Sequence, residues 1–247
     1  MLALTLLLLT AGPSPESLFQ SAMARHQAQS QKKFTYREEL EQWATAKDGT
    51  LKLTETKTFD VIMLEGDNYR KLTLIDGKPL DAKLQKKVDE DLEKTRTARR
   101  RSLKSITRTL SSGTLSDIPR LFSLSLIGEE LINGRKTWRV EATPNPSYKP
   151  ANKEEEKLRN TTRTYWFDQA DGIDIKSRIV YTKTTNGFQP GTEIEVNLSS
   201  VNGTWLADTL FFRFDLKAMA VMKAKGEARH RFLDYKLFEA ESKLVPN

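Results

Sequence analysis

The alternation of hydrophobic and polar residues changes its period along the chain, and each change marks a predicted element. Between Ser14 and about Ser30 apolar residues recur every three or four positions, which predicts an amphipathic helix with Ser14 as its N-cap. From Lys33 onward they alternate with polar residues, as in half-buried strands. Strands are predicted on both sides of Asn133 and at about 34–46, 51–64, 69–75, 161–168, 174–184, 191–201, 204–217 and 221–238.

Short turns rich in Gly and Asn separate these strands. Glu65-Gly66-Asp67-Asn68 and Asn133-Gly134 supply the positive-φ positions that a tight reversal needs. The pattern therefore predicts one helix followed by an antiparallel meander, and the fold class is mainly β with helices (α+β). No linker or repeat divides the chain, so residues 13–247 are predicted to form a single domain.

Several predicted strands carry apolar residues at every second position. We expect these positions to meet on one concave face that is larger than the helices can fill, and to bind a hydrophobic ligand there. The predicted ligand-binding residues are Phe59, Val61, Met63, Trp138, Val140, Phe212 and Phe214. In the last strand Gly226 and Ala228 present small side chains, which either admit the N-terminal helix or leave room for a ligand; close packing of the helix is favoured.

The segment 81–121 interrupts the meander and is predicted to be helical from Asp81 to about Leu110 and again near Leu121. Its first part, 81–108, has ten Lys or Arg and five Asp or Glu, a net charge of +5. A charged run of this kind is usually a solvated helix face. The sharper interpretation is a movable lid, because a narrow apolar stripe holds a helix only weakly. The residues expected to face the cavity are Leu84, Val88, Leu92, Ile118 and Leu121.

Residues 2–9 form an apolar run that is too short to span a bilayer. Small residues follow it, so residues 1–12 are predicted to be a signal peptide and the protein to be exported to the periplasm. No Lys or Arg precedes the run, and the other interpretation is an apolar tail on a cytosolic protein. The chain has no cysteine, so we expect no disulfide and no lipid anchor on a cysteine.

The sequence favours a binding protein over an enzyme. His26 and His230 are the only histidines, and neither lies in a metal-ligand spacing or a nucleophile motif, so no catalytic residue, metal or cofactor is predicted. Asp208 is the one carboxylate on an apolar strand face, where burial could raise its pKa. The net charge is +7. No nucleic-acid motif accompanies it, so anionic lipid headgroups or an acidic protein are the expected partners and nucleic acid is not.

The order of elements and several short motifs resemble the LolA/LolB-like superfamily, and more closely a bacterial group described as outer-membrane lipoprotein-sorting-protein-like. The motifs cover most of residues 55–238 and are Leu64-Glu65-Gly66, Tyr69-Arg70, Asp76-Gly77-Lys78-Pro79-Leu80, Gly134-Arg135-Lys136-Thr137-Trp138, Ala142-Thr143-Pro144 through Pro150, and Trp166-Phe167-Asp168. The resemblance implies a half-open antiparallel β-barrel, covered by an N-terminal helix and a mid-chain helical insertion, that accepts acyl chains of lipoproteins or lipids.

The resemblance also narrows the expected function. Members that sit in the outer membrane carry a lipidated N-terminal cysteine, which this sequence lacks. The first hypothesis is a soluble periplasmic carrier that takes acyl chains toward the outer membrane and exchanges them with a membrane-bound donor or acceptor protein. The second is a periplasmic lipid-sensing or regulatory module that acts through protein contacts. The third is a structural β-domain without a ligand, because apolar strand faces are normally core.

Overall fold

The computed structural model describes residues 12–101, 115–218 and 222–238. The described helices are α1 (Pro15–Gln29), α2 (Ala82–Arg101), α3 (Ile118–Leu121) and α4 (Lys153–Leu158), and a 3-10 turn, η1 (Leu115–Asp117), precedes α3. The strands are β1 (Phe34–Thr45), β2 (Leu51–Leu64), β3 (Asp67–Ile75), β4 (Lys78–Pro79), β5 (Phe122–Ile132), β6 (Arg135–Pro144), β7 (Thr161–Asp168), β8 (Asp174–Tyr181), β9 (Glu193–Val201), β10 (Thr204–Ala218) and β11 (Met222–Leu237).

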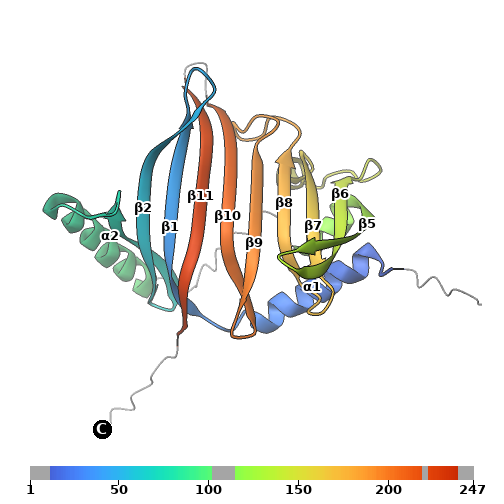
Figure 1. Ribbon diagram of the computed structural model, residues 1–247, viewed down its shortest axis with the longest axis horizontal. Helices are drawn as coiled ribbons and strands as arrows, with labels where there is room; N and C mark the ends of the chain where they lie inside the picture. Colours follow the sequence, from blue (N-terminus) through green and yellow to red (C-terminus); the bar gives the residue numbers. More distant parts are fainter. Residues whose placement is uncertain (1–11, 102–114, 219–221, 239–247) are drawn as a thin grey trace, which may run out of the picture.

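All these strands belong to one open antiparallel sheet (Figure 1). Its order is β4-β3-β2-β1-β11-β10-β9-β8-β7-β6-β5, so the sheet does not close on itself. The first and last strands, β1 and β11, pair in the middle of the sheet, from Phe34 opposite Leu237 to Ala44 opposite Gly226. The predicted class, an open β-barrel with accompanying helices, is confirmed.

The turns between strands follow the sequence signals. At Asn133-Gly134 and Asn202-Gly203 both residues have positive φ, between 50° and 78°. Two consecutive positive-φ residues match the twist of the flanking strands, and Asn and Gly tolerate them best. The same geometry occurs at Glu65-Gly66, so β3 begins at once with Asp67 and the predicted four-residue turn is a two-residue one.

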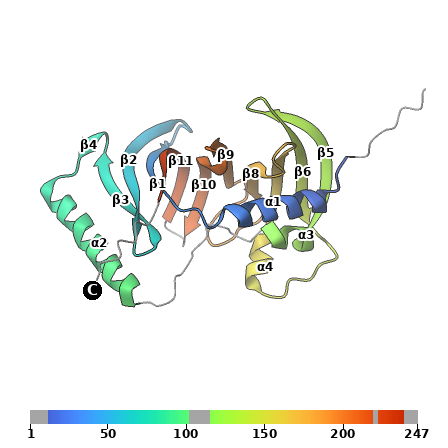
Figure 2. The same cartoon turned by 90° about the horizontal axis from the view of Figure 1, so that it is seen from below.

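Helix α1 lies on one face of the sheet near the β5 edge, as Figure 2 shows from below. The Ser14 side chain accepts a hydrogen bond from the Ser17 N–H at 3.2 Å, and Pro15 occupies the first turn, as predicted. The ring of Phe19 makes edge contacts with the rings of Tyr165 and Phe167, at centroid distances of 4.9 and 5.0 Å. We call this surface of the sheet the α1 face and the other surface the reverse face.

The main core lies between α1, the short helix α3 and strands β5 to β7. Its buried members are Leu18, Phe19, Ala22, Ile118, Leu121, Phe122, Val140, Ala142, Tyr165 and Phe167. Most of them are completely excluded from solvent. This end of the α1 face is therefore closed by the protein's own helices.

Helix α2 packs on the reverse face, at the far end of the sheet from α1. Leu92 forms a small cluster with Leu64 and Tyr69, and Ile62 packs against it. The Tyr69 hydroxyl donates to Asp91 at 2.8 Å, and Arg99 donates to the carbonyl oxygens of Leu64 and Asp67 at 2.8 and 2.9 Å. The apolar contact is small, and side-chain hydrogen bonds to the β2–β3 turn supplement it.

The acidic segment Lys153–Leu158 forms helix α4. Asn152 caps α4 by accepting a hydrogen bond from the Glu155 N–H at 3.0 Å. Glu155 then accepts from the hydroxyl of Tyr148 and forms an ion pair with Arg120, at 3.0 and 2.8 Å. The helix therefore fastens the proline-rich loop after β6 to the end of α3.

Candidate functional site

The register places all seven predicted ligand-binding residues on the α1 face. Cross-strand partners in an antiparallel sheet point to the same side. These partners can be traced across the sheet from β6 through β7, β8, β9, β10, β11 and β1 to β2, on the side that α1 covers. The residues on that side include Phe59, Val61, Met63, Trp138, Val140, Phe212 and Phe214. The packing differs sharply along this face.

Three groups of the predicted residues occupy different surroundings. Val140 is completely buried in the core under α1, and Trp138 packs against that core. Phe59 lies at the other end with Leu40 and Ala228, in a second small cluster. Phe212 packs against this second cluster and remains partly exposed. The predicted site is therefore divided into a part that belongs to the buried core and a part that stays partly exposed.

Between the two clusters runs a band of partly exposed apolar side chains, which we call the apolar strip. The ring of Phe212 contacts the rings of Phe188 and Phe214, at centroid distances of 5.6 and 5.3 Å, and Phe188 contacts Tyr181 at 5.4 Å. Its partly exposed members are Tyr181, Phe188, Ile194, Val196, Leu210, Phe212, Phe214 and Leu72, and the strip ends at the buried side chains of Leu40 and Phe59. Helix α1 reaches β10 at the start of that strand, where the Trp205 N–H donates to Gln29 Oε1 at 3.0 Å. The strip residues of β9 and β10 remain partly exposed.

Only three of the ten strip residues, Phe59, Phe212 and Phe214, are among the predicted ligand-binding residues. Ile194 and Val196 alternate with Glu193 and Glu195, so the period of β9 would have placed them on the apolar side. Phe188 has no such signal. It lies in the loop before β9 and joins the face through an isolated bridge to Leu216.

The small residues of β11 do not receive the N-terminal helix, so that expectation is wrong. A Cβ on Gly226 would lie 2.0 Å from the carbonyl oxygen of Trp43 and 3.2 Å from the ring of Phe214. Gly226 is therefore required because β1 approaches closely and the Phe214 side chain lies over it. Helix α1 instead packs near the β5 edge, where Gly172 leaves room for its Ser21.

The expected lid is divided between the two faces. Ile118 and Leu121 are completely buried under α1 as part of the main core. Leu92 contacts Leu64 and Tyr69 on the reverse face, so the expectation that Leu84, Val88 and Leu92 cover the apolar strip is wrong for α2. The physical reason is the apolar pair Ile62 and Leu64, whose parity is opposite to that of Phe59. The predicted helical residues 102–110 lie outside the described residues.

The reverse face differs from the α1 face in chemistry. Buried Glu227 forms ion pairs with Arg213 and Arg229 at 3.0 and 2.8 Å, and Glu193 pairs with Arg178 and Arg213 at 2.6 and 3.4 Å. Burial favours the neutral form of Glu227, but the hydrogen bonds from the two arginines outweigh it and lower the pKa of this carboxyl. Cross-strand charge pairs thus cover this surface.

A hollow of about 480 Å³ lies over the middle strands on this reverse face. Two cross-strand rows line it, Thr56–Glu41–Arg229–Phe211 and Thr58–Glu39–Arg231–Thr209. None of the seven predicted ligand-binding residues lines it, so it is not the cavity that the sequence predicted.

A polar group interrupts the apolar strip at Glu38, Arg70 and His230. Glu38 is only 5% exposed; it accepts hydrogen bonds from Arg70 Nη2 at 2.7 Å and shares one with His230 Nδ1 at 2.6 Å. The Arg70 guanidinium carbon lies 3.5 Å from the centre of the Phe59 ring. Burial raises the pKa of Glu38, but the hydrogen bonds from His230 and Arg70 outweigh burial, and the net pKa is lowered. Sequence reasoning did not connect these three residues.

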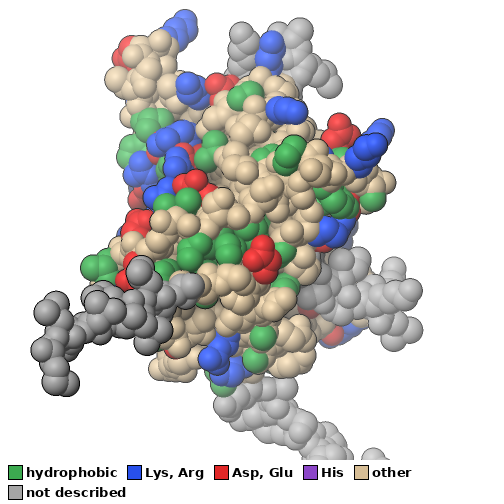
Figure 3. Space-filling view, turned by 90° about the vertical axis from the view of Figure 1, so that its right-hand side faces the viewer, with side chains coloured by type: hydrophobic (Ala, Val, Ile, Leu, Met, Phe, Trp, Pro, Cys, Tyr) green, Lys and Arg blue, Asp and Glu red, His purple; other side chains and the backbone are tan. Residues whose placement is uncertain are grey.

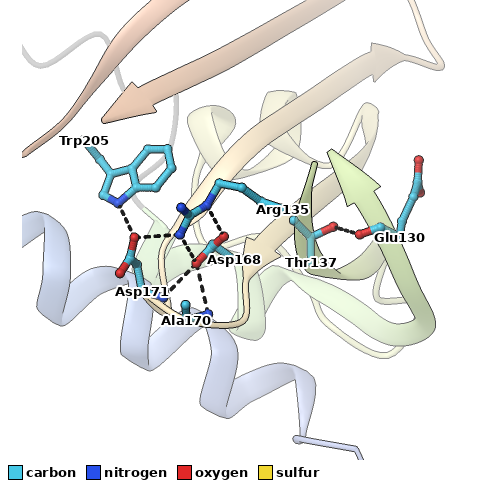
Figure 4. A network of polar contacts seen from close by, with 7 residues as sticks. All are labelled: Glu130, Arg135, Thr137, Asp168, Ala170, Asp171 and Trp205. Atoms are coloured by element: carbon cyan, nitrogen blue, oxygen red, sulfur yellow. Dashed lines mark hydrogen bonds and ion pairs between the residues drawn. The ribbon is translucent and has the colours of Figure 1, made fainter. Parts of the chain in front are cut away.

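A second polar network joins two of the motifs that carry the family resemblance (Figure 4). Arg135 donates to both oxygens of buried Asp168, at 2.6 and 2.8 Å, and to Asp171 at 2.9 Å. Asp171 also accepts from the indole N–H of Trp205 at 3.0 Å. Asp168 also accepts the backbone N–H groups of Ala170 and Asp171. Burial raises the pKa of Asp168, but the hydrogen bonds from Arg135 and from these N–H groups outweigh burial, and the net pKa is lowered. The network fixes the β7–β8 turn beside α1.

The remaining candidates fit structural roles. His26 bonds Asp174 at 2.6 Å, which ties α1 to the start of β8. Asp208 lies at an irregularity of β10, between Ala207 and Thr209. Among the described residues no three His, Asp or Glu are grouped as metal ligands. None of the described helices is both long enough and apolar enough to cross a membrane.

The β5 edge carries exposed apolar side chains. Leu131 is 66% exposed and Ile127 is 51% exposed. Figure 3 shows this end of the molecule, where Lys and Arg are interspersed with Asp and Glu around scattered apolar side chains. The edge therefore mixes both charges with small apolar spots and does not form one continuous apolar surface.

Known proteins resemble this chain in structure more than in sequence. No protein-family model and no curated protein matches it. A LolA superfamily protein from Nitrosomonas europaea aligns over 96% of this chain and 99% of its own, with 11% identity and a TM-score of 0.39. An outer membrane lipoprotein-sorting protein domain from Vibrio parahaemolyticus aligns over 92% and 93%, with 11% identity and a TM-score of 0.38.

A third solved structure of this kind is the lipoprotein LppX from Mycobacterium tuberculosis. It aligns over 90% of this chain and 96% of its own, with 11% identity and a TM-score of 0.30. At this level of identity and TM-score none of these resemblances assigns a function to this chain, and the proposal below rests on its own geometry.

Proposed function

We propose that this protein binds the acyl chain of a lipid or lipoprotein along the apolar strip of the α1 face. The main support for this proposal is that the strip continues the apolar surface of the main core but is left partly exposed by the described helices. Contiguous exposed apolar surface of this kind marks an interaction site in proteins that function as monomers. On the reverse face of the same strands, carboxylates and arginines form cross-strand ion pairs.

The strip has the chemistry that an acyl chain requires. Aromatic and branched side chains from β8 to β10 and from β1 to β3 form it, and the small residues Gly226 and Ala228 of β11 lie between the two groups in the register. Transfer of each methylene from water to such a surface is worth roughly 0.8 kcal/mol. A long chain therefore gains on the order of 10 kcal/mol before the costs of ordering are subtracted.

The proposal extends to the setting of this binding. We propose that residues 1–12 direct export, that the mature chain acts in the periplasm, and that it passes its ligand to a membrane-bound acceptor. The eight-residue apolar run and the small residues after it support export. N-terminal sequencing of the protein recovered from its native cells tests this part, and an intact N-terminus in the cytosol would reject it.

Two neighbouring phenylalanines provide the test of acyl-chain binding. Phe212 points to the α1 face and Phe211, the next residue, points to the reverse face beside Arg213. We expect Phe212→Glu to abolish binding of a fluorescent fatty acid, because a carboxylate would then have to be desolvated in the strip. Phe211→Glu is the matched control and is expected to retain binding.

The outcome separates the proposed function from the alternatives. If both variants fold, as circular dichroism reports, and both bind like the wild type, the strip is not the acyl site. If the wild type binds no acyl ligand, the carrier hypothesis and the lipid-sensor hypothesis both fail. Organic extraction of the natively purified protein followed by mass spectrometry then gives an independent answer about a resident lipid.

A further inference from the structure

We propose that Arg70 and His230 bind the anionic head of the amphiphile, a carboxylate or a phosphate, whose chain lies on the apolar strip. This inference rests on the proposed function and adds the class of ligand to it. Glu38 has the part of a positioning residue, because its carboxylate bonds to the side chains of both Arg70 and His230. The proposal concerns three residues from β1, β3 and β11 that the fold brings together across 192 positions of sequence.

The first observation is that each side chain keeps one nitrogen free of protein partners, a donor in Arg70 and a ring nitrogen in His230. Arg70 uses Nε and Nη2 on Glu38, and His230 uses Nδ1 on the same carboxylate. Nη1 of Arg70 and Nε2 of His230 have no hydrogen-bond partner among the described residues. Arg70 is 41% exposed and His230 is 21% exposed at the side chain, so a ligand can reach both.

The second observation is the position of this group within apolar surroundings. Arg70 lies over the ring of Phe59, and the ring of His230 stacks on Phe232 with an angle of 13° between their planes. Leu40 and Leu210 flank His230 as its cross-strand partners. A ligand that touches both the strip and these donors must combine an apolar chain with a polar head.

The third observation is the sign of the charge. One carboxylate faces one guanidinium and one imidazole, so the charges of Glu38 and Arg70 cancel, and the open Nη1 donor of Arg70 selects for an acceptor group. Nε2 of His230 donates to the same group in the imidazolium form of the ring. A planar guanidinium matches the paired oxygens of a carboxylate or phosphate. A hydrogen bond in which one partner is charged is worth more than a neutral one, and the loss of such a bond lowers affinity about tenfold to hundredfold.

Three ligands with the same chain test the inference by isothermal titration calorimetry below their micelle concentrations. They are dodecanoate, dodecyl phosphate and dodecanol. We expect the wild type to bind one or both anions about tenfold to hundredfold more tightly than the alcohol. A gain with dodecyl phosphate alone identifies a phosphate head, and a gain with dodecanoate alone identifies a carboxylate.

The double variant Arg70→Met, Glu38→Gln is expected to bind all three ligands with the affinity of the alcohol, because it removes the guanidinium without leaving an unpaired buried charge. The reverse face provides a matched control. Arg213 pairs with buried Glu227 at 3.0 Å and lies over the Phe211 ring at 5.2 Å, as Arg70 does with Glu38 and Phe59. Arg213→Met, Glu227→Gln should therefore keep the preference for anions.

The outcomes distinguish failure of the head-group site from failure of the acyl-chain site. Equal affinity of the wild type for the anions and the alcohol would overturn the head-group site while the acyl site stands. Equal loss of preference in the two double variants would overturn it as well, since a general change of charge would then be the cause. If the wild type binds none of the three ligands, the head-group site and the proposed function fail together.

Discussion

The two ends of the α1 face have the same alternation of apolar residues but differ in how deeply those residues are buried. At the β5 end, Val140 and Phe167 lie beneath α1 and are completely buried. Across β9 to β11, Phe212 and Phe214 follow the same period and stay partly exposed. The difference lies in what covers the sheet and not in the strands themselves. A strand pattern therefore identifies an apolar face, but the placement of helices decides which part of that face is core.

The comparison of the two faces adds a second lesson. Phe212 and Phe211 are adjacent in β10, yet Phe212 joins an aromatic cluster and Phe211 lies beside the ion-paired Arg213. Reverse-face carboxylates such as Glu227 and Glu193 are each paired with arginines. Charge pairs make this part of the reverse face compatible with water, whereas the neighbouring positions on the α1 face carry aromatic side chains.

The largest expected effect is a difference in stability between variants at the two ends of the α1 face. Phe19→Ala should cost about 3–5 kcal/mol of unfolding free energy, because Phe19 is completely buried between Tyr165 and Phe167. Phe212→Ala should cost about 1 kcal/mol, since its side chain is already partly solvated. Urea unfolding of both variants measures the difference. Equal costs would mean that the strip is as tightly packed as the core.

Leu92→Ala tests whether α2 is independent of the strip. The change should cost about 2 kcal/mol or less, because it removes the contact with Leu64 and Tyr69 but leaves the hydrogen bonds of Arg99. Hydrogen exchange of residues 82–101 should become faster while fatty-acid affinity stays unchanged. A matched loss of affinity would show that α2 takes part in binding from the reverse side.

A smaller effect follows from the lowered pKa of Asp168. Its folded-state pKa lies below the ordinary value of 3.8, so its bonds stabilise the protein above that value and the contribution is lost as pH falls through the folded pKa. Asp168→Asn should cost about 1–2 kcal/mol at pH 7. Wild type and variant should converge in urea unfolding near pH 2. A difference that does not shrink with acid would assign the cost to packing.

Much of the fold could be predicted from the sequence, because local signals determine it. Ser14 and Pro15 start α1, and Asn133-Gly134 turns the chain between β5 and β6. The parity of Phe212 and Phe214 placed them on the correct face. These features depend on residues close in sequence, where period and turn chemistry suffice.

The candidate site was harder to predict, because it depends on which distant strands pair. Glu38 and His230 meet only since β1 and β11 are neighbours, and no spacing in the sequence indicates that pairing. The position of α2 was wrong for a related reason. A helical stripe such as Leu84, Val88 and Leu92 shows that one side is apolar but not which face of the sheet it meets.

The central claim is that the partly exposed α1 face, between the two clusters, holds an acyl chain. Photocrosslinking with a diazirine-labelled fatty acid, followed by peptide mass spectrometry, tests it most directly. We predict labelling of β9 and β10 at the α1-face positions Val196, Leu210, Phe212 and Phe214, and competition by unlabelled fatty acid. Labelling concentrated on Trp43 and Phe211 of the reverse face, or no competed labelling at all, would contradict the account.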